Sequence, residues 1–226
     1  MHLSIILPAL NEAANIVATL VPLQRMRDKG TEVILVDGGS GDATKTLAAA
    51  LVDRIIDSEP GRARQMNAGA AVAAGEVLLF LHADSQLPDG ADRLIFESLT
   101  GSRFVWGRFD IAISGDHFMF PLIAWFMNHR SRLTGISTGD QGLFVARADF
   151  AQLGGFPDQP LMEDIEFCDR LKTICLPICL HEKIVTSGRR WQKHGVWRTI
   201  FLMWRLRLQY FLGASPDEIH RAYYGK

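Results

Sequence analysis

Short apolar runs that stop abruptly at polar residues are the feature that most constrains what this chain can fold into. The runs are Leu3–Leu7, Glu32–Val36 and Val77–Leu81, and Arg54–Asp57 predicts one more strand. Helical patterns separate these segments at Glu12–Lys29, Asp42–Leu51 and Gly61–Ala74. Runs without polar alternation are typical of strands that are covered on both faces. Strands that alternate with helices predict right-handed crossovers, and therefore an α/β fold with a parallel sheet.

The polar residues that follow these runs are expected to meet. In a parallel sheet the C-terminal ends of the strands lie along one edge, where open α/β sheets bind their ligands. Pro8–Glu12, Asp37–Asp42 and His82–Ser85 all lie just past a predicted strand end. The sequence therefore predicts that these three segments line one crevice.

The second half of the chain is less regular. Partial alternation at Phe104–Ile113 predicts a half-exposed antiparallel strand, and Gln141–Ala146 predicts another strand. Helices are expected at His117–Met127, Glu163–Lys172 and Val196–Leu212, with a last short helix that the capping box Ser215–Glu218 begins. We expect a mixed, mostly parallel sheet, with a nucleotide-binding N-terminal half and a helical C-terminal extension.

The turn after the second run carries candidate ligand contacts. Asp37 precedes glycines at positions 38, 39 and 41, which let a ligand approach the backbone closely. We interpret Asp37 as a contact for a base or ribose, and Asp42 as a helix cap. The chain has no Gly-x-Gly-x-x-Gly motif after its first strand and no P-loop lysine, so it lacks a dinucleotide fingerprint.

Acidic and basic residues at other element ends have two interpretations each. His82 and Asp84 close a buried run, where a divalent cation on a diphosphate would partner the carboxylate; alternatively, Asp84 caps the helix near Pro88. Glu163 and Asp164 begin a helix, where they either complement its dipole or supply a general base for a sugar acceptor. Arg62 lies at a helix start that suits phosphate, or else faces solvent.

Charge and apolar length exclude some classes of partner. The net charge of −1 gives no global attraction to nucleic acid, and no uncharged apolar stretch reaches the roughly 18 residues of a membrane span. Residues 183–212 contain no Asp or Glu but many basic and aromatic residues. This segment is either an interfacial helix on anionic lipid or a core-packing helix with snorkelling arginines. We expect a cytoplasmic protein, with peripheral contact to the inner face of the membrane as one option.

Taken together, these motifs resemble the family-2 glycosyltransferases, which have the GT-A fold. The order and spacing match over about residues 3–172, at Pro8 with Asn11-Glu12, at Val36-Asp37 through Asp42, at Asn67-Ala68-Gly69, at His82-Ala83-Asp84 and at Glu163-Asp164 followed by Glu166 and Arg170. Gly38 and His82 stand where the family has aspartates, and together with Ser187–Trp191 they resemble a small bacterial subgroup with His-Ala-Asp in place of Asp-x-Asp.

The resemblance implies a role for each matched residue. Asp164 would be the catalytic base, and Asp84 would bind Mn²⁺ or Mg²⁺. The nucleotide-sugar contacts would be Pro8, Asn11, Glu12, Asp37, Arg62, Asn67, His82, Asp84 and Glu163. A GT-A domain would span residues 1–186, and a basic amphipathic helical extension would span residues 187–226.

We therefore expect a metal-dependent, inverting glycosyltransferase of the hexosyltransferase type. It would move a sugar from a nucleoside-diphosphate sugar to the hydroxyl of an acceptor, either a lipid or a small molecule. One alternative is a nucleotidyltransferase on a related fold, although no Gly-rich, Lys-containing loop follows Leu7. The other is an inactive, membrane-docked module that binds nucleotide-sugars, which Gly38 and His82 leave open.

Overall fold

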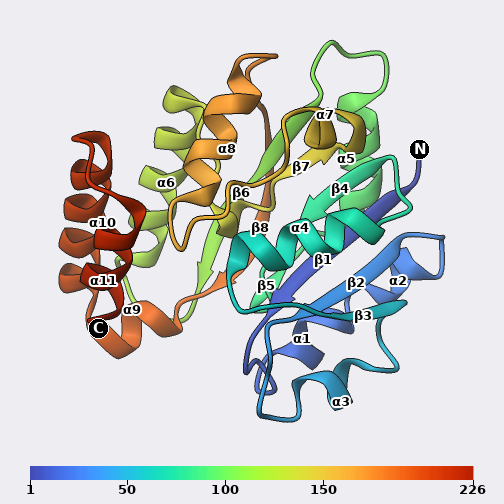
Figure 1. Ribbon diagram of the computed structural model, residues 1–226, viewed down its shortest axis with the longest axis horizontal. Coiled ribbons are helices and arrows are strands. Elements are labelled where there is room, and N and C mark those ends of the chain that lie inside the picture. The colour runs from blue at the N-terminus through green and yellow to red at the C-terminus, as the bar shows by residue number, and fades with distance from the viewer. Residues whose placement is uncertain (226) are drawn as a thin grey trace.

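Among the residues that the structure describes, eight strands form one mixed sheet in the order β3-β2-β1-β4-β7-β6-β8-β5 (Figure 1). The structure is a computed structural model that describes residues 1–225, apart from the side chains of Arg190, His194 and Tyr224. The strands are β1 (Leu3–Ala9), β2 (Glu32–Asp37), β3 (Arg54–Asp57), β4 (Val77–Phe80), β5 (Ser85–Gln86), β6 (Trp106–Ser114), β7 (Phe144–Ala146) and β8 (Ile178–Ser187). Strands β1 to β4 are mutually parallel, whereas β7 is antiparallel to both β4 and β6. The expected mixed, mostly parallel sheet is confirmed.

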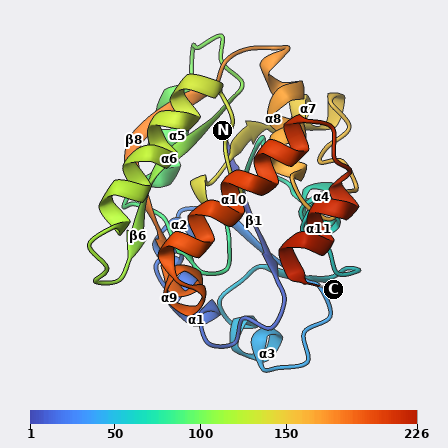
Figure 2. The same cartoon turned by 90° about the vertical axis from the view of Figure 1, so that its left-hand side faces the viewer.

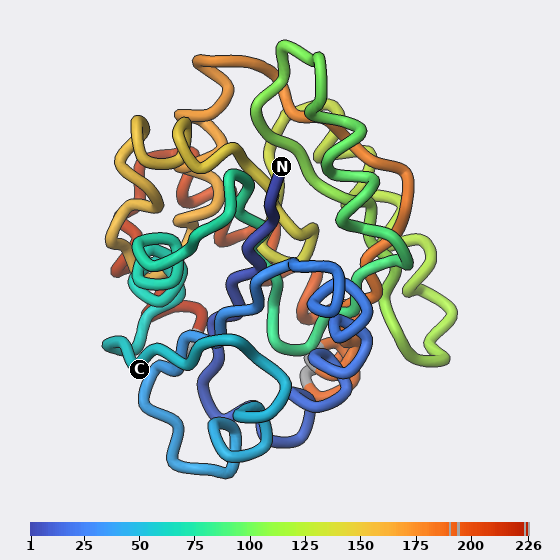
Figure 3. Tube along the Cα trace, turned by 90° about the vertical axis from the view of Figure 1, so that its right-hand side faces the viewer, coloured from blue at the N-terminus to red at the C-terminus, as the bar shows by residue number. Residues whose placement is uncertain are grey.

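Helices cover both faces of this sheet. In chain order they are α1 (Ile16–Leu20), α2 (Gln24–Arg27), α3 (Thr44–Ala48), α4 (Arg62–Val72), α5 (Ala91–Leu99), α6 (Phe120–Thr134), the 3₁₀ turn η1 (Gly139–Gln141), α7 (Arg147–Gln152), α8 (Glu163–Lys172), α9 (Arg189–His194), α10 (Val196–Phe211) and α11 (Pro216–Tyr224). Because side chains alternate along a strand, Ile5 and Leu7 join one core with α1, α2, α3 and α5, while Ile6 joins the other with α4, α7 and α8. In Figure 3 the blue to cyan segment that contains α1, β2, α3 and β3 lies in the lower part of the view.

Strand β6 differs from the half-exposed antiparallel strand that alternation predicted. It pairs in parallel with β8, and its residues from Trp106 to Ile111 are buried. Arg108 and Asp110 created the alternation, but in the interior they form an ion pair with each other instead of facing water. Strand β8 was not predicted, because its middle residues 181–183 are exposed and polar and interrupt the apolar pattern.

The first helical segment is shorter and more broken than the pattern predicted. In place of one helix over Glu12–Lys29, the chain forms α1 and α2 with a turn at Pro22, since proline has no amide to continue a helix. Asn11 is not the N-cap of this helix. It has a left-handed backbone (φ 55°), and its side-chain oxygen accepts a hydrogen bond from the amide of Gly41 at 2.9 Å.

The C-terminal helices pack against the second half of the domain. Leu206 of α10 is fully buried in a cluster with Ile136, Met162, Ile165 and Ile219 of α11. The side-on view in Figure 2 shows α10 crossing the molecule between α6 and α8. The predicted capping box is present, because Ser215 and Glu218 exchange both hydrogen bonds at the start of α11. Within residues 1–225, no helix has both the length and the apolar character needed to cross a bilayer.

The contact between α4 and the sheet yields a stability prediction. A Cβ at Gly69 would lie 2.5 Å from Cγ2 of Ile6 and 2.9 Å from Cγ2 of Val36, so helix and sheet would have to separate. We expect Gly69→Ala to destabilise the fold by roughly 1–3 kcal/mol in urea denaturation, despite the better helix propensity of alanine. Ala71→Val, on the exposed side of the same helix, is the control and should cost less than Gly69→Ala. Equal stability of Gly69→Ala and the wild type would contradict this packing.

Candidate active site

Asp37 ends β2 and is held by the turn that follows it. The carboxylate is completely buried, and its Oδ2 accepts hydrogen bonds from the amides of Gly39 at 3.0 Å and Ser40 at 2.8 Å. Its Oδ1 is buried without a hydrogen-bond partner among the described residues. Since a buried acceptor without a partner is costly, this oxygen is the natural contact for a ligand donor.

Gln65 fills the space beside Gly38, where the family has a second aspartate. A Cβ at Gly38 would lie 3.0 Å from Nε2 of Gln65. That amide nitrogen donates to the carbonyls of Ala9 and Val36, at 2.8 and 2.9 Å, and so joins the ends of β1 and β2. Gln65 therefore forms a structural bridge beside Gly38, and no motif in the sequence marked it.

The segment after β1 is fixed by polar contacts to the turn after β2. The amide of Asn11 donates to Oγ of Ser40 at 2.9 Å, and the amide of Glu12 donates to Oγ1 of Thr44 at 2.8 Å. These bonds bring the first two strand-end segments together, as the parallel topology predicts.

Arg189 joins the third segment to the first. Its Nη2 lies 3.5 Å from Oε2 of Glu12 and 3.5 Å from Oδ2 of Asp84. It comes from α9 in the C-terminal extension, so it is far from both carboxylates in sequence. The acid-free run of basic residues contained this arginine, but the pattern left open lipid contact or core packing and did not predict a place beside Asp84.

His82 and Asp84 both lie beyond the end of the strand, so the alternation of a strand does not fix the directions of their side chains. Strand β4 ends at Phe80, and the imidazole turns inward beside η1, where a Cβ at Gly139 would lie 2.4 Å from Nε2 of His82. This Nε2 is buried and has no partner among the described residues. Burial, reinforced by the charge of Arg62, lowers the pKa of His82 to about 3, so the ring is neutral at physiological pH.

A narrow cavity brings five of the predicted site residues together. Its walls include Pro8, Arg62, His82, Glu163 and Asp164. Asp164 is held in place because Oδ2 accepts from the amide of Gly139 at 3.1 Å and Oδ1 accepts from the amide of Ile165 at 2.9 Å. Met162, just before α8, has a left-handed backbone (φ 66°), which is strained for a residue other than glycine and turns the two acids into the cavity.

Glu163 is 2% exposed and has an unusual environment for a carboxylate. Burial raises its pKa to about 7, and the neighbouring charge of Asp164 contributes in the same direction. Arg62, whose Nη1 is 3.6 Å from Oε1 of Glu163, opposes this shift but does not overcome it. Of two adjacent acids, Glu163 thus retains its proton nearer to neutral pH.

Asn67 lies apart from the predicted ligand contacts. Its amide nitrogen donates to the carbonyl of Phe156 at 2.8 Å, and its oxygen accepts from the amide of Phe156 at 3.0 Å. Both ends of the side-chain amide are thus engaged, which indicates that Asn67 positions the loop leading towards Glu163 and Asp164.

The residues around Asp84 are compatible with a divalent cation. Among the described residues no group of three or more His, Cys, Asp or Glu side chains could hold a metal. Mg²⁺, however, is commonly bound by one or two carboxylates together with substrate phosphates. Asp84 fits this arrangement as a single protein ligand, and Arg189 beside it shows that this position favours positive charge.

The raised pKa of Glu163 predicts how stability depends on pH. Between about pH 4.5 and 7 the native carboxyl keeps its proton while the unfolded chain releases it, so stability falls as the pH rises. We expect Glu163→Gln, which cannot ionise, to lose less stability than the wild type between about pH 5 and pH 8 in urea denaturation. Glu166→Gln, an exchange in the same helix at a less buried position, is the control. Parallel pH profiles for Glu163→Gln and the wild type would show that Glu163 ionises normally.

Comparison with known proteins assigns the chain to a family. The 91 residues most similar to a PGL/p-HBAD biosynthesis glycosyltransferase of Mycobacterium tuberculosis are 42% identical and cover 37% of this chain. They span only 36% of the length of that relative. An uncharacterized glycosyltransferase of the same species is 29% identical over 190 residues, which cover 78% of this chain and 71% of the relative.

Solved structures share the fold at low identity. Glucosyl-3-phosphoglycerate synthase from M. tuberculosis, in complex with Mn²⁺, UDP and glucosyl-3-phosphoglycerate, matches with a TM-score of 0.59 and 22% identity, over 82% of this chain and 70% of that one. S. aureus TarS in complex with UDP-GlcNAc matches with a TM-score of 0.65 and 17% identity, over 83% of this chain and 58% of that one.

The sequence pattern of one family, Glycosyl transferase family 2, matches residues 4–152, about two thirds of the 226-residue chain. The protein therefore belongs to glycosyltransferase family 2.

Proposed function

We propose that the protein transfers a hexose from a UDP-sugar to the hydroxyl of an acceptor, with inversion and with Asp164 as the general base. The observation that carries this proposal is the position of Asp164. Two backbone amides orient its carboxylate in the wall of a cavity whose other side is formed by Pro8 and His82 at the strand ends. A base fixed in this way lies between the predicted donor edge and the second half of the domain.

The donor is held by the strand-end segments in this proposal. Asp37 presents Oδ1 to the base or ribose, and Arg62 lies at the cavity wall where it reaches phosphate. The complexes of structural relatives contain UDP or UDP-GlcNAc, which supports UDP as the nucleotide that carries the sugar. Pro8, Asn11 and Glu12 complete the nucleotide side, whereas Asn67 acts through the loop it braces.

The diphosphate leaving group meets Asp84 and Arg189 in this proposal. Asp84 holds Mn²⁺ or Mg²⁺, which offsets the negative charge that develops on the departing UDP. The synthase with the related fold contains Mn²⁺ in one complex and Mg²⁺ in another. Arg189 lies within 3.5 Å of Asp84 and adds a second positive group for the phosphates.

Inversion follows from a single displacement. Asp164 accepts the proton of the acceptor hydroxyl while the hydroxyl oxygen attacks the anomeric carbon and the bond to UDP breaks on the opposite face. Burial raises the pKa of Glu163 to about 7, so it is about half protonated at neutral pH, and we assign the base role to Asp164 because two backbone amides orient its carboxylate. The buried, neutral His82 shapes the cavity floor next to Gly139.

The finer assignments are part of the same proposal. Gly38 and His82 support the assignment of the chain to a subgroup with His-Ala-Asp at the metal position, in which Gln65 takes the space of the second aspartate. Residues 1–186 form the GT-A domain, and residues 187–226 form a helical extension that contributes Arg189 to the site. The exposed aromatic residues Trp197, Phe201 and Trp204 of α10 are available for peripheral contact with a membrane.

The base assignment predicts the effect of removing one carboxylate. Asp164→Asn keeps the size of the side chain but cannot accept the proton, so we expect transfer from the UDP-sugar to fall by about 100-fold or more. Affinity for UDP with Mn²⁺ should change little. Asp158→Asn, an exposed change in the preceding loop, is the control for turnover. Near-normal turnover in Asp164→Asn would refute its role as the base.

The position of Arg189 predicts an effect on the nucleotide. Arg189→Met removes a charged contact to the diphosphate, so the Kd for UDP in the presence of Mn²⁺ should rise by about 10-fold. Arg198→Met, an exposed change on α10, should leave it unaltered. Calorimetric titration with UDP measures both. An unchanged Kd in Arg189→Met would show that Arg189 forms ion pairs with Glu12 and Asp84 but does not contact UDP.

A further inference from the structure

Two arginines on the acceptor side of Asp164 have no carboxylate contact. Arg130 belongs to α6 and Arg207 to α10, and each is partly buried. Within the part of the chain that the structure describes, neither guanidinium lies within 4.0 Å of a carboxylate oxygen. In the sequence, Arg207 is one of the basic residues of the acid-free segment 183–212.

The packing of α10 places Arg207 over the acceptor side. Its neighbour Leu206 is fully buried against Ile136, Met162 and Ile165. Met162 and Ile165 flank the two acids at the start of α8, and Ile136 leads into the turn that contacts Asp164. Figure 2 shows the same relation, with the far end of α10 beside α8. The helix therefore brings Arg207 close to the proposed base.

Buried polar atoms without partners gather around Arg130. Its Nη2 makes only a long contact, 3.5 Å, to Oγ1 of Thr138, and its Nε is buried and unpartnered. The same is true of Oγ of Ser131, Oδ1 of Asp140 and Nε2 of Gln141. Folded proteins rarely leave such atoms unsatisfied, so the N–H and O–H donors among them indicate a place that a ligand with acceptor oxygens completes. Oδ1 of Asp140 is itself an acceptor, and a phosphate does not satisfy it.

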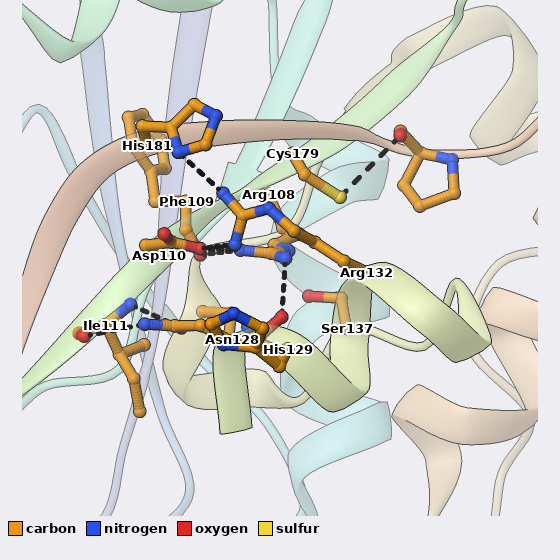
Figure 4. A network of polar contacts seen from close by, with 12 residues as sticks. Arg108, Phe109, Asp110, Ile111, Asn128, His129, Arg132, Ser137, Cys179 and His181 are labelled. Carbon is orange, nitrogen blue, oxygen red and sulfur yellow. Dashed lines mark hydrogen bonds and ion pairs between the residues drawn. The ribbon is translucent and has the colours of Figure 1, made fainter. Parts of the chain in front are cut away.

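Arg108 is a buried arginine whose guanidinium pairs with a carboxylate inside the fold, and it serves as a comparison for Arg130. It is completely buried on β6, and its guanidinium contacts the carboxylate of Asp110 and the carbonyl of Asn128 (Figure 4). Arg132 binds the same carboxylate at 2.6 Å. Arg130 lies two residues from Arg132 on the same helix, and although the charges of Asp140 and Asp164 act on it, it forms no ion pair within 4.0 Å among the described residues, which separates it from the Arg108–Asp110–Arg132 network.

The charges of Arg130 and Arg207 act on each other. Burial and the charge of Arg207 lower the pKa of Arg130 to about 10, while the charges of Asp140 and Asp164 act in the opposite direction. Burial also lowers the pKa of Arg207, while Asp164 and Asp140 raise it. Both side chains remain cationic at neutral pH. Two cations brought together in a partly desolvated place are stabilised by an anion between them.

We propose that Arg130 and Arg207 bind a phosphate group on the acceptor substrate, beside the hydroxyl that Asp164 deprotonates. The planar guanidinium offers paired donors that match phosphate oxygens, and two of them neutralise a phosphate monoester. This inference rests on the proposed function, because it names the class of acceptor for that site. The phosphate belongs either to a small molecule or to a lipid.

Calorimetry with a small phosphate monoester tests the site directly. The protein is first titrated with UDP and Mn²⁺, and then the saturated complex is titrated with glycerol 3-phosphate. Glycerol serves as the neutral counterpart. We expect glycerol 3-phosphate to bind more tightly than glycerol, and Arg207→Met to weaken its binding by about 10-fold or more. Arg205→Met, an exposed change on the same helix, should have no effect.

A second variant and a lipid arm complete the test. Arg130→Met should weaken the binding of glycerol 3-phosphate in the same way, and it replaces Arg207→Met in the test if that variant does not fold. The same variants are floated with phosphatidylcholine vesicles that contain phosphatidic acid, against phosphatidylcholine alone. Flotation that depends on phosphatidic acid, and that Arg207→Met loses but Arg205→Met keeps, assigns the phosphate to a lipid. Glycerol 3-phosphate binding that Arg207→Met and Arg130→Met weaken but Arg205→Met does not assigns it to a small molecule.

The outcomes separate this inference from the proposed function. If UDP binds but neither phosphate probe depends on Arg207 and Arg130, the acceptor site is refuted and the donor site stands. If UDP fails to bind, the proposed function fails, and glycerol 3-phosphate titrated into the free protein still decides the arginine site. Equal losses in Arg205→Met and Arg207→Met indicate general surface attraction and overturn the proposal.

Discussion

The parallel alignment of β1, β2 and β4 is the constraint on which the rest of the structure depends. It brings three polar segments that are distant in sequence to one edge of the sheet. The hydrogen bonds from Asn11 and Glu12 to the turn after β2 then fix the edge, and Asp37 is left with one unpartnered oxygen there. A family-2 glycosyltransferase needs such an edge for its donor, and the strands provide it before any ligand is present.

The second half of the chain closes this edge from the other side. The strained backbone at Met162 turns Glu163 and Asp164 toward the strand ends, and burial keeps one of these acids protonated near neutral pH. The C-terminal helices add Arg189 on the donor side and Arg207 on the acceptor side. In our proposal, the extension is therefore part of the active site, and its outward aromatic residues do not belong to that site.

The sequence predicted the parallel half well, because apolar runs such as Val77–Leu81 are too uniform to be anything but buried strands. It failed where charge was buried. Arg108 and Asp110 mimicked an exposed face, and the polar middle of β8 concealed a strand. Within the site, local motifs indicated the acids but not Gln65 or Arg189, since these reach the edge from α4 and α9 through contacts that no local pattern reveals.

Binding of UDP to the strand edge tests the central claim most directly. The measurement is the Kd for UDP in the presence of Mn²⁺, by calorimetry, for the wild type and for Asp37→Asn, with thermal melting as the check on folding. Asn keeps the shape of the side chain but lacks the charge of the buried carboxylate. We predict that affinity falls by about 10-fold or more in a folded variant. Equal affinity in the two proteins would contradict a nucleotide site built on the end of β2.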